Sequence, residues 1–529
     1  MRIRPGYLVA LALLIGITPA FSQERPDRLP RQDRQERSLQ RQDRRPDQRP
    51  DQQRADRSES PTPPAAAADS DPQGVLKLLP ADAVSEKQVS IDGHPFAYTA
   101  TAGTLSLYGQ SGNRLGAVFF TAYVAKGADA GNRPITFAFN GGPGAASAYL
   151  HLGLVGPRIA DFGPEGRDGT TAKLRDNPET WLAFTDLVLI DPINTGWSRA
   201  ARPDDAKAFQ GVNSDANSIA KVIALYVAHN SRSASPKYLL GESYGGFRAA
   251  KVARALHNDQ GIIVSGIVMV SPMLETSYQW SAERDPFKAA LVFPTVAVTE
   301  LDRTKKYTPQ AMADSERFAL NEYLPTLAGT PPTGERAQEF YGKIAQLTGL
   351  PIETVAKSGG YVRSAYLNRI REKGQTSTYD ASIAIVDPYV ETPFSSSGDP
   401  MLEGYLHALS GIFVGYARDE LGFKTDMTYT LLARAQWDWG GSGSRPGVSY
   451  DLRETLSLEP SFRLLVAHGR NDLVTPYGIN RYLLDQIRPP AAPDRVQLKT
   501  YRGGHMFYFD DAARRAFTAD AKLFYQGGH

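Results

Sequence analysis

One short stretch constrains the fold of this chain more than any other, and it reads KYLLGESYGGF over residues 237–247. An apolar run ends at residues 241–245, Gly-Glu-Ser-Tyr-Gly, and a helix-like stretch over 247–256 follows at once. A Gly-x-Ser-x-Gly turn between a strand and a helix is typical of a nucleophile elbow, whose glycines leave room for a tight backbone that exposes the serine hydroxyl. The pattern predicts that Ser243 is a nucleophile. A chance pentapeptide is the alternative, so the rest of the chain has to decide between the two.

The N-terminus has the pattern of an export signal. A basic start at residues 1–4 precedes a short apolar core at 8–17 and small residues at cleavage spacing at 20–22. The core is too short to span a bilayer comfortably, so we expect residues 1–22 to be a signal peptide, with an uncleaved anchor as the alternative. This predicts a periplasmic or secreted protein with no stable membrane insertion after cleavage.

Residues 23–73 differ sharply in composition from the rest of the chain. They are rich in Arg, Asp, Gln and Pro and hold almost nothing that a core can bury, so we expect a disordered linker. Adhesion to an anionic envelope polymer through the arginines is an alternative, although the interleaved aspartates cancel much of the charge. The whole chain carries a net charge of +2, which gives no reason to expect nucleic acid as a partner. It contains no cysteine, so its stability has to come from packing without disulfides.

Strand-like and helix-like stretches alternate over residues 74–273. Opening antiparallel strands are followed by buried apolar runs at 134–139, 186–192 and 266–271, and apolar residues recur at helical spacing over 214–229. Strands that alternate with helices predict an α/β fold, in which a mostly parallel central sheet is covered by helices on both faces.

The alternation stops at about residue 274. Amphipathic helical stretches separated by Pro- and Gly-rich turns fill residues 274–450, which we interpret as a mainly helical cap insertion. The sheet resumes in residues 451–529, with strands at 462–467 and 497–501 and a closing helix. We therefore expect the segments before and after the insertion to be two parts of one catalytic domain.

Two late motifs supply the partners that a nucleophilic serine needs. Asp472 follows the first strand of the closing part, and His505 follows the last. In an α/β-hydrolase the catalytic residues come in the order serine, acid, histidine, with acid and base on loops after the last strands. We expect His505 to take the Ser243 proton and hand it to the leaving group, while Asp472 fixes the histidine tautomer. His468 is a rival base, but it precedes the proposed acid and would break the order.

These motifs, together with a glycine-rich loop after the strand at 134–139, resemble the serine carboxypeptidase family. The resemblance spans about residues 88–525, and the cap region is unmatched by motif. It rests on the following stretches: 140–144 (NGGPG), 156–157 (GP), 177–181 (NPETW), 192–198 (PINTGWS), 241–245 (GESYG), 469–478 (GRNDLVTPYG) and 504–506 (GHM).

The resemblance implies an α/β-hydrolase fold and a serine-type carboxypeptidase that releases C-terminal residues from peptides through an acyl-enzyme on Ser243. It implies an oxyanion hole formed by the backbone amides of Gly142 and Tyr244. It further implies that Asn140 and Glu242 bind the terminal carboxylate of the substrate. A glutamate that faces a carboxylate has to be protonated, because two like charges at hydrogen-bond distance cannot both stay ionised in a partly dry cleft. We therefore expect activity to favour acidic pH, with an ion-paired support for the turn as the alternative role of Glu242.

The chain also departs from the family pattern around the expected carboxylate site. Ala138 replaces the usual Trp, Ala145 replaces a cysteine, Leu154 replaces a supporting glutamate, and Arg470 replaces an acid. None of these positions belongs to the proposed catalytic triad of Ser243, Asp472 and His505. With fewer hydrogen-bonding groups around it, however, a carboxylate is expected to be bound less selectively. Arg470, or a cap arginine such as Arg363 or Arg369, is a candidate for electrostatic compensation.

Other functions stay open at this stage. An esterase or acyltransferase uses the same triad, since an alcohol can resolve an acyl-enzyme as well as water can. An aminopeptidase that releases proline carries a similar glycine loop, although Asn140 and Glu242 fit a carboxylate better than an amine. A noncatalytic envelope protein that retains the fold is a further alternative, against which the ordered triad speaks. The sequence predicts peptides as partners, no metal and no cofactor, because no metal-ligand spacing or complete phosphate loop occurs.

Overall fold

A ten-stranded sheet forms the centre of the computed structural model, which describes residues 74–163, 168–371, 374–386, 399–434, 436–441, 443–489 and 492–527. All of these residues lie in one compact unit, Asp69–His529. The predicted signal peptide and linker, residues 1–73, lie outside the described residues. The strands of the sheet are β1 (Ala83–Ile91), β2 (His94–Tyr108), β3 (Arg114–Ala125), β4 (Ile135–Phe139), β7 (Asp186–Ile190), β8 (Arg199–Ala200), β9 (Lys237–Glu242), β10 (Gly266–Val270), β13 (Arg463–Gly469) and β14 (Val496–Tyr501).

The order of the strands separates an antiparallel edge from a parallel body. The sheet runs β1-β2-β3-β7-β4-β9-β10-β13-β14, and β8 pairs with β3. Strands β1, β2, β3 and β7 pair antiparallel, whereas every pair from β7 through β14 is parallel. The carboxyl ends of parallel strands meet at the same edge, which is where ligands bind in open α/β sheets. The predicted α/β fold with a mostly parallel sheet is confirmed.

Apolar residues of the parallel strands alternate between two separate cores. Leu239 and Ile267 belong to one buried cluster, and their neighbours Leu240 and Val268 belong to the other. A strand directs successive side chains to opposite faces, so a continuous apolar run needs cover on both. One cluster includes residues of helices α2 (Val212–His229), α3 (Tyr244–Gln260), α12 (Ser449–Leu458) and α13 (Tyr477–Ile487). The other includes residues of α1 (Ala148–Leu150), α11 (Pro400–Asp419) and α14 (Asp511–Gln526).

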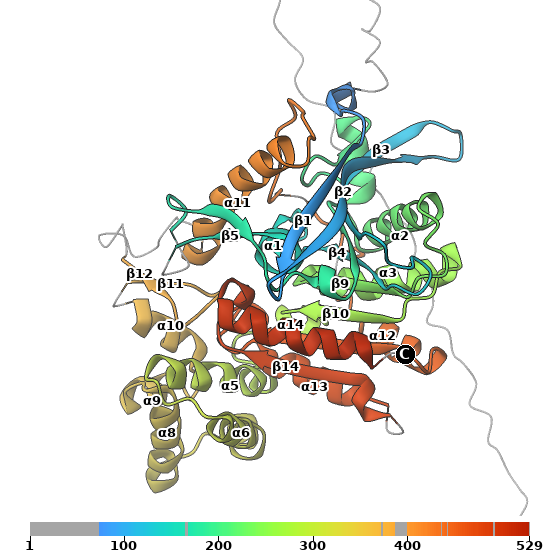
Figure 1. Cartoon of the computed structure of the whole chain (residues 1–529). Helices are drawn as coiled ribbons and strands as arrows, with labels where there is room; N and C mark the ends of the chain where they lie inside the picture. Colours follow the sequence, from blue (N-terminus) through green and yellow to red (C-terminus); the bar gives the residue numbers. More distant parts are fainter. Residues whose placement is uncertain are drawn as a thin grey trace, which may run out of the picture. The chain divides into compact units, whose positions relative to one another are not determined.

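The segment between β10 and α12 is an insertion into the sheet order. Figure 1 shows its middle helices gathered beside the sheet, in yellow-green to tan. They are α4 (Thr276–Gln279), α5 (Pro286–Arg303), α6 (Pro309–Phe318), α7 (Leu324–Ala328), α8 (Gly334–Thr348), α9 (Ile352–Lys357) and α10 (Arg363–Arg371), with two short strands, β11 (Gln375–Thr376) and β12 (Ala384–Ile385), after them. The expected boundary at residue 450 falls inside α12. No helix among the described residues is long and apolar enough to cross a membrane.

Candidate active site

Ser243 occupies a strained turn between β9 and α3. Its backbone has φ 60° and ψ −124°, a positive φ that is uncommon for a residue other than glycine. A Cβ on Gly241 would lie 2.0 Å from the Gly245 carbonyl oxygen, so the turn requires glycine at position 241. Ser243 stays partly exposed although Glu242 and Tyr244 on either side of it are buried. This is the geometry that the elbow pattern predicts.

Asp472 and His505 form a buried hydrogen-bonded pair. The Nδ1 atom of His505 lies 2.7 Å from Oδ2 of Asp472. The other carboxylate oxygen, Oδ1, accepts hydrogen bonds from the amides of Val474 at 2.8 Å and Thr475 at 3.0 Å. Because the carboxylate is held as an acceptor on both oxygens, Nδ1 of His505 carries the proton and Nε2 is left as the basic nitrogen.

The electrostatics of the pair suit a general base. Burial alone would raise the pKa of Asp472, but the charge and hydrogen bond of His505 outweigh it, and the pKa is lowered. Burial alone would lower the pKa of His505, but the charge and hydrogen bond of Asp472 outweigh it, and the pKa is raised. His505 therefore becomes a stronger base than a free imidazole while Asp472 stays ionised.

Ser271 connects the acid–base side of the site to the elbow. It directly follows β10, whose last carbonyl, at Val270, accepts a hydrogen bond of 2.9 Å from the Ser243 amide. The Ser271 hydroxyl donates to the His505 carbonyl oxygen at 2.8 Å. Ser243, Asp472 and His505 thus lie on loops at the carboxyl ends of neighbouring parallel strands.

The rival base His468 is separate from this group, because its Nε2 lies 2.8 Å from the amide nitrogen of Asn480 and burial lowers its pKa to about 4.

The glycine-rich loop packs directly on the elbow. A Cβ on Gly141 would lie 2.5 Å from the Tyr244 amide nitrogen, so the close approach requires glycine. Tyr244 is the first residue of α3, where an amide has no partner within the helix. The loop therefore brings Gly141 against the free end of α3, and Gly142, the residue expected in the oxyanion hole, is next to it in the chain. The insertion holds this loop from outside, since Ala433 donates its amide to the Gly144 carbonyl at 2.8 Å.

Glu242 and Asn140 contact each other in the buried space behind the serine. The Asn140 side-chain amide donates to Oε2 of Glu242, and the Tyr508 hydroxyl donates to the same oxygen at 2.8 Å. Asn140 is itself held by the amide of Leu150, which donates to its side-chain oxygen at 3.1 Å. No described residue donates a hydrogen bond to Oε1 of Glu242.

Glu242 is protonated more readily than an ordinary glutamate. Burial raises its pKa to about 7, and the positive charge of His505 and the hydrogen bonds of Tyr508 and Asn140 reduce that effect only in part. No positively charged side chain forms an ion pair with it among the described residues, which does not fit a role as an ion-paired support for the turn. A carboxyl group that is neutral near pH 7 can donate a hydrogen bond to a carboxylate.

The candidate compensating arginines turn to other partners. The Arg470 guanidinium donates to both oxygens of Asp302, at 2.8 and 2.9 Å. Arg363 donates to the Leu473 carbonyl at 3.1 Å, and Nη1 of Arg369 lies 3.7 Å from Glu300. Among the contacts of the described residues, none joins any of the three arginines to Glu242. Electrostatic compensation through these arginines is therefore not part of the observed site.

Three tyrosines at the site were not predicted from the sequence. Tyr508 bonds Glu242 as described above, and Tyr379 of the insertion packs edge-on against the His505 ring at 5.1 Å. The Tyr379 carbonyl also accepts a hydrogen bond of 2.6 Å from the His505 amide. Tyr149 is 3% exposed, and its hydroxyl has no hydrogen-bond partner among the described residues. Burial and then the negative charge of Glu242 raise the pKa of Tyr149, which places its phenol within electrostatic reach of that carboxyl.

An aromatic wall leads away from the elbow. The Tyr244 ring meets Trp437 at 5.2 Å and Trp439 at 5.5 Å between centroids, both edge-on. Trp439 in turn meets Trp280 at 4.8 Å, and Trp280 is 44% exposed. The described residues contain no group of three or more His, Asp or Glu side chains placed to hold a metal ion. The site described so far consists of the serine, the acid–base pair and the buried carboxyl.

Comparison with known proteins agrees with this geometry. A profile of the serine carboxypeptidase family matches residues 95–340, which include the glycine loop, Glu242 and Ser243. Over these residues the chain is similar to the serine carboxypeptidase family. The matched segment ends before Asp472 and His505, which the fold brings to the serine from the far end of the chain.

Individual relatives of the family match only parts of the chain. The retinoid-inducible serine carboxypeptidase of Rattus norvegicus is 30% identical over 134 residues, which are 25% of this chain and 27% of that protein. Serine carboxypeptidase-like 44 of Arabidopsis thaliana is 25% identical over 202 residues, 36% of this chain and 40% of that protein. The chain thus spans less than half the length of these curated relatives.

The fold extends the likeness over most of the chain. A prohormone-processing carboxypeptidase from Saccharomyces cerevisiae, KEX1(DELTA)P, superposes with a TM-score of 0.52 at 14% identity, covering 81% of this chain and 91% of that one. At this identity the likeness shows the α/β-hydrolase fold alone. Family and fold together support a hydrolase.

Proposed function

We propose that this protein is a serine-type carboxypeptidase that releases C-terminal residues from peptides. The observation that carries the proposal is Glu242, a buried carboxyl with a pKa of about 7 that has no ion-pair partner among the described residues and lies next to the nucleophile in the chain. A terminal carboxylate is the ligand that a neutral carboxyl and an amide can bind together.

We propose that the three triad residues act in the following order. Nε2 of His505 takes the proton of Ser243 as its Oγ attacks the scissile carbonyl, and the amides of Gly142 and Tyr244 stabilise the oxyanion. His505 then gives the proton to the leaving amine, and the C–N bond breaks to leave an acyl-enzyme. Water, activated by the same nitrogen, attacks the ester, and Ser243 leaves with its proton restored.

Recognition of the terminal carboxylate involves Glu242 and Asn140. Oε2 of Glu242 accepts from Asn140 and Tyr508, so the proton of the neutral carboxyl sits on Oε1, where it can be donated to the substrate. The Tyr149 hydroxyl adds a second donor in the same space. Glu242, Asn140, Tyr508 and Tyr149 are thus the polar groups of the proposed carboxylate site. They stand in for the hydrogen-bond network of the family pattern, from which Leu154 and Arg470 depart.

A comparison of three substrates tests the proposal. A blocked dipeptide with a free C-terminal carboxylate, its C-terminal amide and a simple ester are assayed from acidic to neutral pH. We expect kcat/KM for the free acid to exceed that for the amide by at least about tenfold, the worth of one charge-assisted hydrogen bond. Turnover of the ester alone would identify an esterase or acyltransferase instead, and no turnover of any of the three would favour a noncatalytic protein.

The variant Ser243→Ala separates this site from any contaminating enzyme. It is expected to abolish turnover of all substrates, a loss of about a millionfold for a serine nucleophile, without moving the thermal midpoint. Peptide hydrolysis at the wild-type rate by this variant would remove Ser243 as the nucleophile. We further propose export through the N-terminal signal, so the protein should be recovered, shortened by residues 1–22, from the periplasm or the medium.

A further inference from the structure

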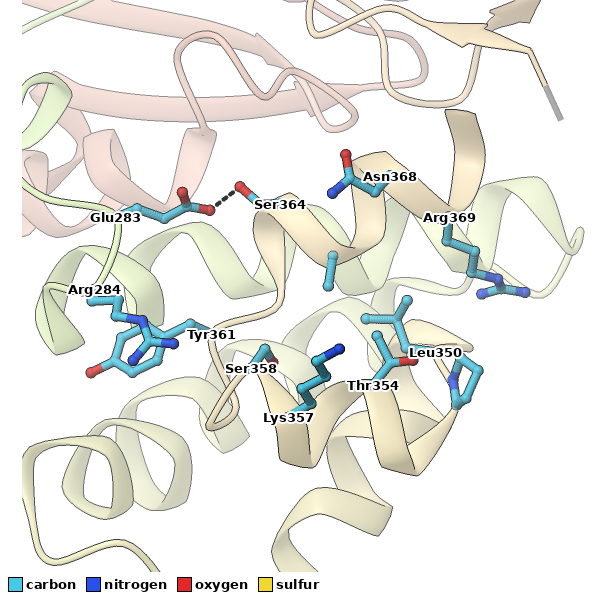
Figure 2. Close-up of a pocket in the computed structure, with 12 residues that line it drawn as sticks. Glu283, Arg284, Leu350, Thr354, Lys357, Ser358, Tyr361, Ser364, Asn368 and Arg369 are labelled. Atoms are coloured by element: carbon cyan, nitrogen blue, oxygen red, sulfur yellow. Dashed lines mark hydrogen bonds between the residues drawn. The ribbon is translucent and has the colours of Figure 1, made fainter. Parts of the chain in front are cut away.

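A polar pocket lies inside the insertion, away from the triad. It has a volume of about 540 Å³ and is enclosed by α9, α10 and the loop between α4 and α5. Figure 2 shows the side chains that line it, and those that carry the argument are Arg284, Thr354, Lys357, Ser358, Ser364 and Asn368. Arg284 and Lys357 can only donate hydrogen bonds, and Thr354 and Asn368 add groups that can donate, whereas the hydroxyls of Ser358 and Ser364 already donate to the Val355 carbonyl and to Glu283.

The charge balance of this pocket is positive. Figure 2 shows the Lys357 side chain rising from α9 into the pocket, and among the described residues no carboxylate pairs with it. Arg284 also lacks a carboxylate partner there, and its guanidinium stacks 5.7 Å from the centre of the Tyr361 ring. Glu283 is the opposing charge, and it accepts the Ser364 hydroxyl. Arg369 turns outward to Glu300, so two unpaired cations and one engaged carboxylate face the pocket.

Two observations relate the pocket to the candidate active site. Trp280, at the end of the aromatic wall that begins on Tyr244, is followed within four residues by Glu283 and Arg284. On the other side, α10 begins at Arg363, which donates to the carbonyl of Leu473 next to the proposed acid. A smaller pocket of about 140 Å³ shares Glu283 and Tyr361 with the first and includes Arg363.

We propose that this pocket binds a carboxylate side chain of the peptide substrate, upstream of the scissile bond, so that acidic peptides are preferred. The proposal rests on the proposed carboxypeptidase function. A substrate held by its C-terminus at Glu242 extends away from the elbow in the N-terminal direction, and the aromatic wall gives it an apolar path. Arg284 follows Trp280 by four residues in the chain, and Lys357 lines the same pocket as Arg284.

Peptide length sets which substrates can reach the pocket. An extended peptide covers about 3.3 Å per residue, and the wall from Tyr244 through Trp280 to Arg284 spans on the order of 20–30 Å by the ring separations and the four residues after Trp280. A peptide of about ten residues is therefore long enough, and a dipeptide is not.

A matched pair of peptides tests the proposal by direct binding. Both are blocked peptides of about ten residues with the same four C-terminal residues, and the upstream half alternates Gly with Glu in one and with Gln in the other. Their Kd values are measured by calorimetry on the full chain carrying Ser243→Ala. We expect the Glu peptide to bind about three- to tenfold more tightly at low salt, the range that one or two exposed ion pairs supply, and the difference to vanish at about 0.5 M NaCl.

The same measurement on Ser243→Ala with Arg284→Gln and Lys357→Gln should give equal Kd values for the two peptides. Lys343→Gln, which removes an exposed lysine of α8 outside the pocket lining, serves as the control and should keep the preference. Equal binding by the unaltered pocket at low salt, or a preference that survives the double replacement, would overturn the proposal. A titration with inorganic phosphate at constant ionic strength is a further test. Tight phosphate binding without any preference for the Glu peptide would show a site for free anions and would also overturn the proposal.

Turnover of the blocked dipeptide keeps the two proposals apart. The wild-type protein and the variant with Arg284→Gln and Lys357→Gln should hydrolyse it at the same rate, because it is too short to reach the pocket. A failure to hydrolyse it refutes the carboxypeptidase function, whereas normal hydrolysis with equal binding of the two longer peptides refutes the pocket alone.

Discussion

Replacing Glu242 by Gln gives the sharpest check on the buried carboxyl. Only the neutral form can donate to a substrate carboxylate, and the neutral fraction falls from about nine tenths at pH 6 to about one tenth at pH 8 for a pKa of about 7. The raised pKa means that the carboxylate-binding form is present below about pH 7 and is lost above it. Hydrolysis of an ester without a carboxylate does not need this form.

The expected quantity is therefore a ratio. In the wild type, kcat/KM for the free-acid dipeptide divided by kcat/KM for the ester should fall about tenfold between pH 6 and pH 8, equivalent to about 1.4 kcal/mol. Dividing by the ester value removes the titration of His505, which both substrates share. This ratio refines the expectation that activity favours acidic pH, because the raised pKa of His505 works against turnover at low pH.

In Glu242→Gln the ratio should not change with pH. The variant's side-chain oxygen can accept from Asn140 and Tyr508 in place of Oε2, and its amide nitrogen then donates to the substrate at every pH. The assay is initial-rate kinetics on both substrates at half-unit pH steps. A variant ratio that still falls about tenfold over this range would refute the reasoning, since the titrating group would lie elsewhere.

Two further predictions concern the neighbours of this group. Gly141→Ala should reduce turnover of peptide and ester alike by at least about a hundredfold, because a Cβ would lie 2.5 Å from the Tyr244 amide and displace the oxyanion loop. Circular dichroism checks that the fold persists, and unchanged ester kinetics would contradict the placement of the loop. Tyr149→Phe removes one hydroxyl that has no partner in the described structure, so KM for the free-acid dipeptide should rise about tenfold while ester kinetics and thermal stability stay unchanged. An equal change for both substrates would assign Tyr149 a role in packing.

The sequence was sufficient for the parts of the site that local pattern encodes. The turn at Ser243 needs glycines on both sides, and the loops of Asp472 and His505 need only follow consecutive strands of one sheet, so spacing and chain order predict all three positions. The alternation of strands and helices likewise predicted the parallel body of the sheet, which is confirmed. The role of each site residue in catalysis stays a prediction.

The surroundings of Glu242 could not be read in the same way. Tyr508 and Tyr149 have no motif of their own, and their approach to the carboxyl depends on how α1 and the segment after His505 pack on the sheet. Arg470 was a candidate for compensation because of its position in sequence, but its partner Asp302 lies on α5, 168 residues away. Long-range pairing of this kind is decided by tertiary packing, on which a single sequence carries little signal.

The insertion also fastens both sides of the site by backbone hydrogen bonds. The carbonyl of Tyr379 accepts a hydrogen bond from the His505 amide, and the amide of Ala433 donates one to the carbonyl of Gly144 in the glycine-rich loop, so two parts of the insertion contact the site. A segment of this kind cannot be exchanged between relatives as an independent specificity module. Grafting a foreign insertion onto this sheet should lower kcat as well as change KM. A shortened enzyme without the insertion should lose the correct placement of His505 before it loses substrate binding.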